Sequence, residues 1–194
     1  MSPDVGVATH VADLVELIAF EDLRDVVVVL HSYAGILVGP VVEQTGRRIR
    51  TVVHLGAFVV EPGECLLDVE PPETAVRYRE LVAKEGDGWR LPASDAFLDA
   101  WGVTDPVAKA WVGPRLTDFP FRCQTDPVDY DPAALAAVKQ VYVRHTDPPL
   151  ASLDASFARA VAAGWRTIDV ASGHDVMVAA PEELAGILDD VADD

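Results

Sequence analysis

Residues 26–35 read VVVVLHSYAG, an unbroken apolar run that passes directly into a histidine and a serine. Such a run, mostly valine, is typical of a strand buried on both faces of a parallel sheet, so a strand is expected over Val26–Leu30. The apolar residues from Ala34 to Val42 predict a helix, which the Gly39-Pro40 pair should kink or shorten. Ser32 therefore lies at a predicted strand-to-helix turn.

The same alternation continues on both sides of this turn. Apolar residues at helical spacing predict a helix over Thr9–Phe20, ahead of the first strand. Later in the chain, the pattern predicts strands over 51–55, 141–144 and 167–170 and helices over 153–163 and 181–191. Strands that alternate with helices predict an α/β fold with a mostly parallel sheet flanked by helices.

Residues of about 62–135 have a different texture. Prolines, glycines and aspartates are scattered through them, three of the four tryptophans fall there, and no strand-like run is present. We expect an insertion of short helices and loops. The chain of 194 residues suits one domain at roughly 150 residues per domain, so residues 1–194 are expected to form a single domain that carries this insertion.

Composition excludes several classes of partner and compartment. Fifteen Lys and Arg stand against 32 Asp and Glu, and the net charge of −17 repels nucleic-acid phosphates and anionic membrane surfaces. The two cysteines, Cys65 and Cys123, form no disulfide framework or CxxC pair. No basic signal segment is visible, and no apolar run reaches the ~20 residues of a membrane span. A cytoplasmic protein is expected.

Three residue types that carry acyl-transfer chemistry follow predicted strands. Ser32 follows the strand over 26–30, Asp147 follows the strand over 141–144, and His174 follows the strand over 167–170. Because the carboxyl ends of parallel strands meet at one edge of a sheet, all three are expected there. Taken singly, each residue has an ordinary structural explanation: Ser32 as a helix cap, Asp147 as a turn residue before a proline, and His174 as a loop residue. Taken together, their order is that of a nucleophile, an orienting acid and a base.

Several motifs along nearly the whole chain support a family resemblance. They are VLHSYAG at 29–35, LGAFV at 55–59 with PGE at 62–64, GWRLP at 88–92, VYVR at 141–144, and SGHD at 172–175 with PEEL at 181–184. With them the chain resembles the actinobacterial branch of the hydroxynitrile lyase and plant methyl-esterase group of α/β-hydrolases. The GWRLP stretch falls in the cap of that family, the insertion that roofs the active site.

The resemblance implies a role for each candidate residue. Ser32 would be the nucleophile, His174 the base and Asp147 the orienting acid, and the backbone N–H of Tyr33 would bind the oxyanion. Phe58 and Trp111 are expected to line a pocket for an apolar substrate. No GxGxxG or GxxxxGK[ST] motif anchors a nucleotide, and the five histidines lack HExxH or paired spacing, so neither a cofactor nor a metal is expected.

The chain departs from the family pattern in three places. Leu30 replaces the first small residue of the usual Gly-His-Ser-Tyr-Gly-Gly elbow, and Ala34 replaces the second. The acid loop, 144–147, is one residue shorter than usual. The family's first strands, with the His-Gly loop that supplies the second oxyanion donor, have no counterpart before Thr9. The resemblance therefore implies an N-terminally truncated α/β-hydrolase, and one lost donor typically costs about 10² to 10³ in turnover.

Truncation should leave the strand over Val26–Leu30 at an open edge of the sheet. An exposed apolar edge promotes association. We expect a two-fold homodimer, formed edge to edge along this strand or by exchange of the N-terminal helix. The alternative is that a separate polypeptide or an upstream segment supplies the missing strands.

Three functions remain open from the sequence. The first is an enzyme that attacks a small ester, lactone or related carbonyl compound through Ser32; the tailoring of a natural product is one setting for this reaction. The second uses the same pocket for cyclase or lyase chemistry without hydrolysis. The third, from a different class, is a degenerate binding or assembly protein. The retained Ser32, Asp147 and His174 favour an enzyme, whereas Leu30 and the absent oxyanion loop favour the degenerate protein.

Overall fold

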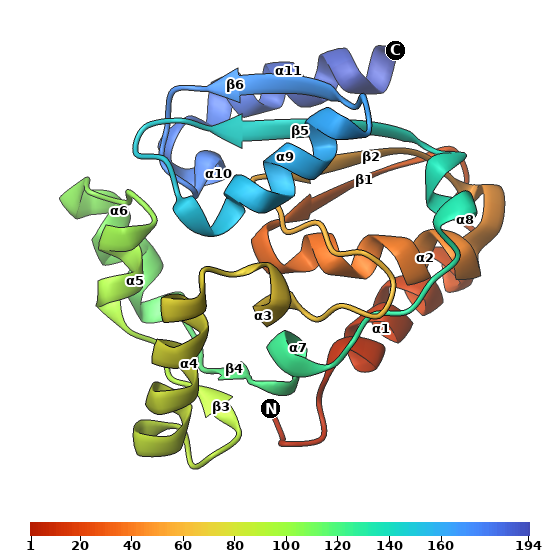
Figure 1. Ribbon diagram of the computed structural model, residues 1–194. Helices are drawn as coiled ribbons and strands as arrows, with labels where there is room; N and C mark the ends of the chain where they lie inside the picture. The colour runs from red at the N-terminus through yellow and green to blue at the C-terminus, as the bar shows by residue number, and fades with distance from the viewer.

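A four-stranded parallel sheet forms the centre of the computed structural model, which describes residues 1–194 (Figure 1). Its strands are β1 (Val26–His31), β2 (Ile49–Leu55), β5 (Lys139–His145) and β6 (Arg166–Val170), in the order β1-β2-β5-β6. All four strands point the same way, so their carboxyl ends lie along one edge of the sheet. The predicted α/β fold with a parallel sheet is confirmed.

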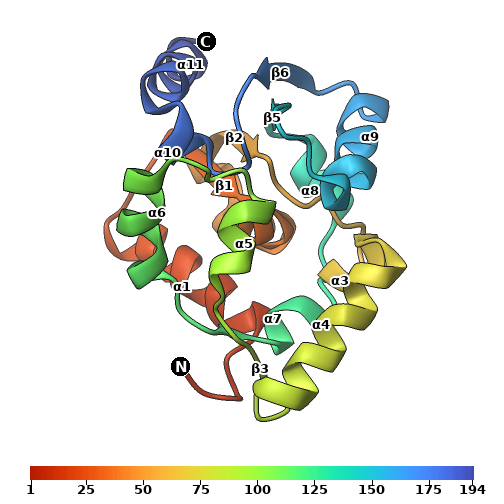
Figure 2. The ribbon, with the colours of Figure 1, turned by 90° about the vertical axis from the view of Figure 1, so that its left-hand side faces the viewer.

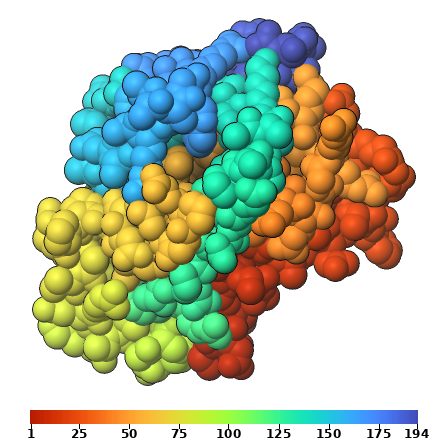
Figure 3. All heavy atoms as spheres, turned by 45° about the vertical axis from the view of Figure 1, so that its right-hand side comes forward, coloured from red at the N-terminus to blue at the C-terminus, as the bar shows by residue number.

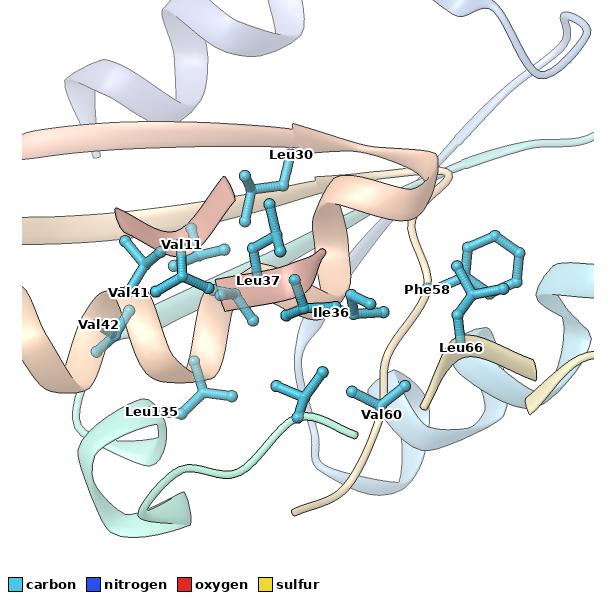
Figure 4. Packing of buried hydrophobic residues seen from close by; sticks show 14 of the residues in the cluster. Val11, Leu30, Ile36, Leu37, Val41, Val42, Phe58, Val60, Leu66 and Leu135 are labelled. Atoms are coloured by element: carbon cyan, nitrogen blue, oxygen red, sulfur yellow. The ribbon is translucent and has the colours of Figure 1, made fainter. Parts of the chain in front are cut away.

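Helices cover the two faces of this sheet. On one side, α1 (Val7–Phe20) and α2 (Val38–Thr45) bury Val11 and Val41 in a cluster with Leu30 of β1 (Figure 4). On the other side, α11 (Pro181–Asp193) packs Leu184 against the sheet. The remaining elements beside the sheet are η1 (Ser32–Leu37), η2 (Gly46–Arg48), η4 (Ala151–Leu153), α9 (Asp154–Ala162) and α10 (Val176–Ala179).

The segment between β2 and β5 forms a cap beyond the carboxyl ends of the strands (Figures 1 and 2). It contains α3 (Leu66–Val69), α4 (Pro72–Glu85), β3 (Arg90–Leu91), α5 (Asp95–Ala100), α6 (Pro106–Val112), η3 (Gly113–Arg115), β4 (Phe119–Pro120) and α7 (Arg122–Thr125), and α8 (Pro132–Ala136) then returns to the sheet. In Figure 3 the cap, yellow to green, lies against the red N-terminal segment.

Two backbone hydrogen bonds close the base of the cap. The N–H of Gly63 donates to the carbonyl oxygen of Val128 over 2.7 Å, and the N–H of Val128 donates to Glu64 over 2.8 Å. The α4 helix and the β3–β4 ladder were not predicted from the sequence. Val82 is the one buried residue of α4, so its helical periodicity is weak.

The turn from β1 into η1 has unusual backbone geometry. Ser32 has a φ of +55°, a left-handed backbone conformation that residues other than glycine rarely adopt. Gly35 lies so close to the next loop that a Cβ atom there would be 2.4 Å from the carbonyl oxygen of Phe58. Leu30, at the first small position of the family elbow, points into the core toward Leu37 (Figure 4). The elbow therefore accommodates a leucine by burying it under α1 and η1.

The outer strand differs from the sequence pattern in its burial. β1 lies at the edge of the sheet, since β2 is its one hydrogen-bonded neighbour. Val26, Val27 and Val28 are half-buried and Val29 is 39% exposed, so Leu30 is the one fully buried residue of the run. The prediction of burial on both faces is therefore wrong for this run, because no strand covers the outer side of β1.

No helix combines the length and the apolar character needed to cross a membrane.

We expect two copies of the chain to associate through this edge. Size-exclusion chromatography with light scattering should give the mass of a dimer, and Val29→Lys, which places a charge on the edge strand, should weaken association by at least about tenfold. Val107→Lys, at a 76% exposed position in the cap, is the matched control. A wild-type protein that stays monomeric at all concentrations contradicts this prediction.

The backbone of Ser32 predicts a difference between two variants that both lack its hydroxyl group. Ser32→Gly should be more stable than Ser32→Ala by about 1 kcal/mol, because only glycine adopts positive φ without strain. Urea unfolding of the two variants measures this difference directly. Equal midpoints would mean that the turn relaxes when the hydroxyl group is removed.

Candidate active site

Ser32 and His174 meet at the carboxyl edge of the sheet. The Oγ atom of Ser32 lies 2.9 Å from Nε2 of His174, within hydrogen-bonding distance, although the two residues are 142 positions apart in the sequence. Ser32 begins η1 after β1, and His174 lies in the loop between β6 and α10. His174 is 2% exposed. This geometry suits proton transfer from the serine hydroxyl to the imidazole.

The structure does not bring Asp147 to this pair. Asp147 is exposed, and Nδ1 of His174 is buried without any hydrogen-bond partner. The loop after β5 continues the pairing with the chain after β6, because the N–H groups of Thr146 and Asp147 donate to the carbonyl oxygens of Val170 and Ser172. These bonds fix the short loop with Asp147 at the surface. Asp147 therefore does not occupy the orienting position that the resemblance implied.

Two other histidines surround His174. The ring centroid of His31 lies 4.5 Å from that of His174, and the ring centroid of His145 lies 4.9 Å from it. His31 uses Nε2 to bond the carbonyl oxygen of His174 over 3.1 Å, and the carboxylate of Asp175 lies 3.8 Å from the same nitrogen. Both ring nitrogens of His145 are buried without partners. Sequence reasoning missed this cluster, although His31 and His145 end parallel strands and His174 follows one, which is the signal that predicted the meeting of Ser32 and His174.

Burial keeps the histidines of this cluster neutral. It lowers the pKa of His174 from its ordinary 6.5 to about 2, and positive charge on His31 or His145 adds to the effect. Burial also lowers the pKa of His145 to about 4, and it lowers the pKa of His31. Burial raises the pKa of the Asp175 carboxyl group. A neutral His174 can accept a proton, which is the state a general base requires.

Tyr33, the predicted oxyanion residue, directly follows Ser32. It is the second residue of η1, and the first N–H groups of a helix have no acceptor within the helix. Its hydroxyl group lies 2.9 Å from Nδ1 of His10, a contact that holds α1 against the elbow. The backbone N–H of Tyr33, next in the chain to Ser32, therefore has no acceptor within η1.

A cavity of about 270 Å³ opens above Ser32 and His174. Its walls are mostly apolar and come from both the sheet edge and the cap. Phe58, which was predicted to line a pocket, is one of the residues in these walls. The cap contributes Leu91, Phe97, Trp101 and Phe119.

The structure does not place Trp111 in the cavity wall. Trp111 lies on α6, is 57% exposed and stacks against Arg115 outside the cavity. Trp101 takes the place expected for it, and its carbonyl oxygen accepts a hydrogen bond from the N–H of His174 over 2.7 Å. The cap holds three tryptophans, and its loops have no periodicity from which the inward one could be chosen.

Two buried polar residues in the cavity wall were also missed. Glu70 and Gln124 are each 8% exposed, and one oxygen of each side chain has no hydrogen-bond partner. Burial raises the pKa of Glu70. No set of three or more His, Cys, Asp or Glu side chains converges in a geometry that could hold a metal ion.

Comparisons with known proteins agree with this geometry. The model of the alpha/beta hydrolase family matches residues 2–187. A carbendazim hydrolyzing esterase of Nocardioides sp. (strain SG-4G) is 29% identical over 196 residues, which cover 94% of this chain and 77% of that protein.

Solved structures show the same fold. An extracellular alpha/beta-hydrolase from a Paenibacillus species, described as sharing structural and functional homology with tobacco salicylic acid binding protein 2, superposes with a TM-score of 0.85 at 18% identity, covering 96% of this chain and 80% of that one. A methylesterase from Arabidopsis gives a TM-score of 0.68 at 19% identity, covering 96% and 78%. These matches confirm the α/β-hydrolase fold that the sequence resemblance implied. The chain belongs to the alpha/beta hydrolase family and is a hydrolase-type enzyme.

Proposed function

We propose that this hydrolase cleaves small, neutral carboxylic esters through a covalent acyl-enzyme on Ser32. The observation that carries the proposal is the 2.9 Å contact between Ser32 Oγ and His174 Nε2 at the floor of the apolar cavity. The esterase among the relatives supports the same reaction type.

The proposed reaction has two halves. Ser32 Oγ attacks the ester carbonyl carbon while His174 Nε2 takes the hydroxyl proton, and the backbone N–H of Tyr33 stabilises the oxyanion. The carbon–oxygen bond of the ester then breaks, and His174 returns the proton to the departing alcohol. In the second half, His174 removes a proton from water, which attacks the acyl carbon. The bond from this carbon to Ser32 Oγ then breaks, and His174 returns the proton to Oγ, which releases the acid and restores Ser32.

The cavity indicates which substrates fit. Phe58, Trp101 and Phe119 offer flat apolar surfaces, so burial of an aromatic or branched acyl or alcohol group drives binding. The net charge of −17 disfavours anionic esters. A natural-product role, suggested by the resemblance, remains a prediction.

A specific observation favours a second candidate, lyase-type proton transfer. His174 is a buried, neutral base without a carboxylate beside Nδ1, and Tyr33 N–H is the one oxyanion donor that can be assigned. The lack of a second oxyanion donor slows acyl transfer more than it slows the removal of an acidic proton, because no tetrahedral oxyanion needs to be stabilised in that reaction.

Replacement of Ser32 tests the nucleophile. We expect the wild type to hydrolyse p-nitrophenyl acetate and to be labelled by a fluorophosphonate, and Ser32→Ala to lose at least about 100-fold in hydrolysis and all labelling. Thr104→Ala, which removes the hydroxyl group of an exposed residue in the cap outside the cavity, is the matched control. If the fluorophosphonate labels neither the wild type nor Ser32→Ala, Ser32 is not an activated nucleophile and the lyase-type reaction takes precedence.

The buried histidines predict the dependence of activity and stability on pH. Since the pKa of His174 lies far below 6.5, kcat/KM should stay constant between pH 7.5 and the pH at which the protein unfolds. Burial lowers the pKa values of His54, His145 and His174 in the folded protein. In the unfolded chain these histidines bind protons below about pH 6.5, whereas in the folded protein they stay neutral there. The free energy of unfolding should therefore fall as the pH drops below that value. A half-maximal kcat/KM near pH 6.5, in a protein still folded by circular dichroism, would contradict this.

A further inference from the structure

We infer that His145, rather than Asp147, is the residue that positions His174, an assignment that rests on the proposed role of His174 as the base. His145 ends β5 and is 3% exposed, directly beside the His174 ring. The third member of the site is then an uncharged imidazole, where the residue order alone suggested a carboxylate.

Gly56 locates the two nitrogens that would interact. A Cβ atom built on Gly56 would lie 2.9 Å from Nδ1 of His145 and 3.3 Å from Nδ1 of His174. Both Nδ1 atoms therefore border the same small space, which exists because Gly56 has no side chain. Gly56 also has a φ of +47°, which favours glycine at this position.

The chemistry of His174 requires an acceptor in that space. For Nε2 to accept the proton of Ser32, the other nitrogen, Nδ1, must carry the ring proton. That N–H group is buried and has no partner. A neutral His145 has one unprotonated nitrogen that can accept a hydrogen bond. A hydrogen bond from His174 Nδ1 to His145 Nδ1, formed by a small rotation of either ring, holds the required tautomer.

The other groups that face His174 either have a hydrogen-bond partner already or offer no acceptor atom. His31 donates through Nε2 to the carbonyl oxygen of His174, and Asp175 lies beside that same nitrogen of His31. Trp101, whose ring centroid is 6.2 Å from that of His174, has an indole N–H and no acceptor nitrogen. Among the ring neighbours of His174, His145 is the one whose two nitrogens are both buried without partners.

An imidazole in this position has a distinct consequence for catalysis. A carboxylate would stabilise the positively charged His174 that forms when Ser32 loses its proton, whereas a neutral His145 holds the tautomer without supplying that charge. The site is therefore organised for a base that stays neutral down to low pH.

Three substitutions at one position test this assignment. In Asn and Asp, Oδ1 is attached to Cγ just as Nδ1 is in histidine, so both can place an acceptor at the same point, and Leu cannot. We expect His145→Leu to lower kcat on p-nitrophenyl acetate about 10- to 100-fold with KM changed less than about twofold, and His145→Asn to restore most of the loss. His145→Asp should bring an acid limb into the pH profile at least about one pH unit above that of the wild type, because a carboxylate raises the pKa of His174.

Asp147→Asn is the competing arm of the same experiment. If Asp147→Asn lowers kcat as much as His145→Leu is expected to, while His145→Leu leaves it unchanged, the carboxylate positions His174 in solution and the assignment to His145 is overturned. A similar loss of kcat in His145→Leu and His145→Asn, with no change of the pH profile in His145→Asp, reduces His145 to a packing residue and also overturns it.

A spectroscopic readout separates this inference from the proposed function. Long-range ¹H–¹⁵N spectra of the imidazole groups report which nitrogen of His174 carries the proton, whether or not the protein turns over an ester. We expect the Nδ1–H tautomer in the wild type and in His145→Asn, and the Nε2–H tautomer in His145→Leu. An unchanged tautomer in His145→Leu overturns the positioning role even if Ser32 is labelled. Absent labelling with the expected tautomers overturns only the esterase.

Discussion

The turn at Ser32 is the constraint on which the rest of the structure depends. A left-handed backbone at Ser32 directs the hydroxyl group away from the sheet and toward His174. The turn is held by the sheet below it and by the contact of Gly35 with the loop at Phe58, which also lines the cavity. Strain of about 1 to 3 kcal/mol at such a position persists only where the surrounding structure imposes it. The core of α1, η1 and α2 under Leu30 supplies that support.

Burial explains most of the electrostatic character of the site. The rings of Trp101, His31 and His145 surround His174, and this burial disfavours its charged form. The same exclusion of water strengthens each remaining polar contact around Ser32. The orphaned nitrogens of His145 and His174 and the oxygens of Glu70 and Gln124 show that the protein keeps unsatisfied polar groups around its cavity. Each such group costs about 1 to 3 kcal/mol when buried. Thr51 and His54 of β2 also carry buried polar atoms without partners, so this cost is not confined to the cavity.

The sheet and the Ser32–His174 pair could be predicted from the sequence, and several details could not. The valine run and the returning strand–helix alternation carry strong periodic patterns, and parallel strands bring their carboxyl ends together whatever the loops contain. The position of Asp147 could not be predicted, because a difference of one residue in loop length determines whether its side chain points inward or to the surface. Backbone hydrogen bonds from Thr146 and Asp147 to Val170 and Ser172 hold this loop with Asp147 at the surface. The position of Trp111 could not be predicted either, because the cap has no periodic pattern that indicates which tryptophan faces the cavity.

The closed base of the cap bears on what a replacement of the cap would have to supply. Gly63, Glu64 and Val128 are joined by backbone hydrogen bonds, so the intervening chain begins and ends at nearly the same point. The entropy of closing a loop grows only slowly with its length, about 0.6 kcal/mol for each doubling. A cap of different length grafted between these residues would also have to replace the packing of Leu66, Leu67 and Val69 in the core and the acceptor that Trp101 offers to the N–H of His174. The part that selects the substrate and the part that performs the reaction meet at Trp101, which lines the cavity and holds the backbone of His174, so a change in the cap reaches the base through this residue.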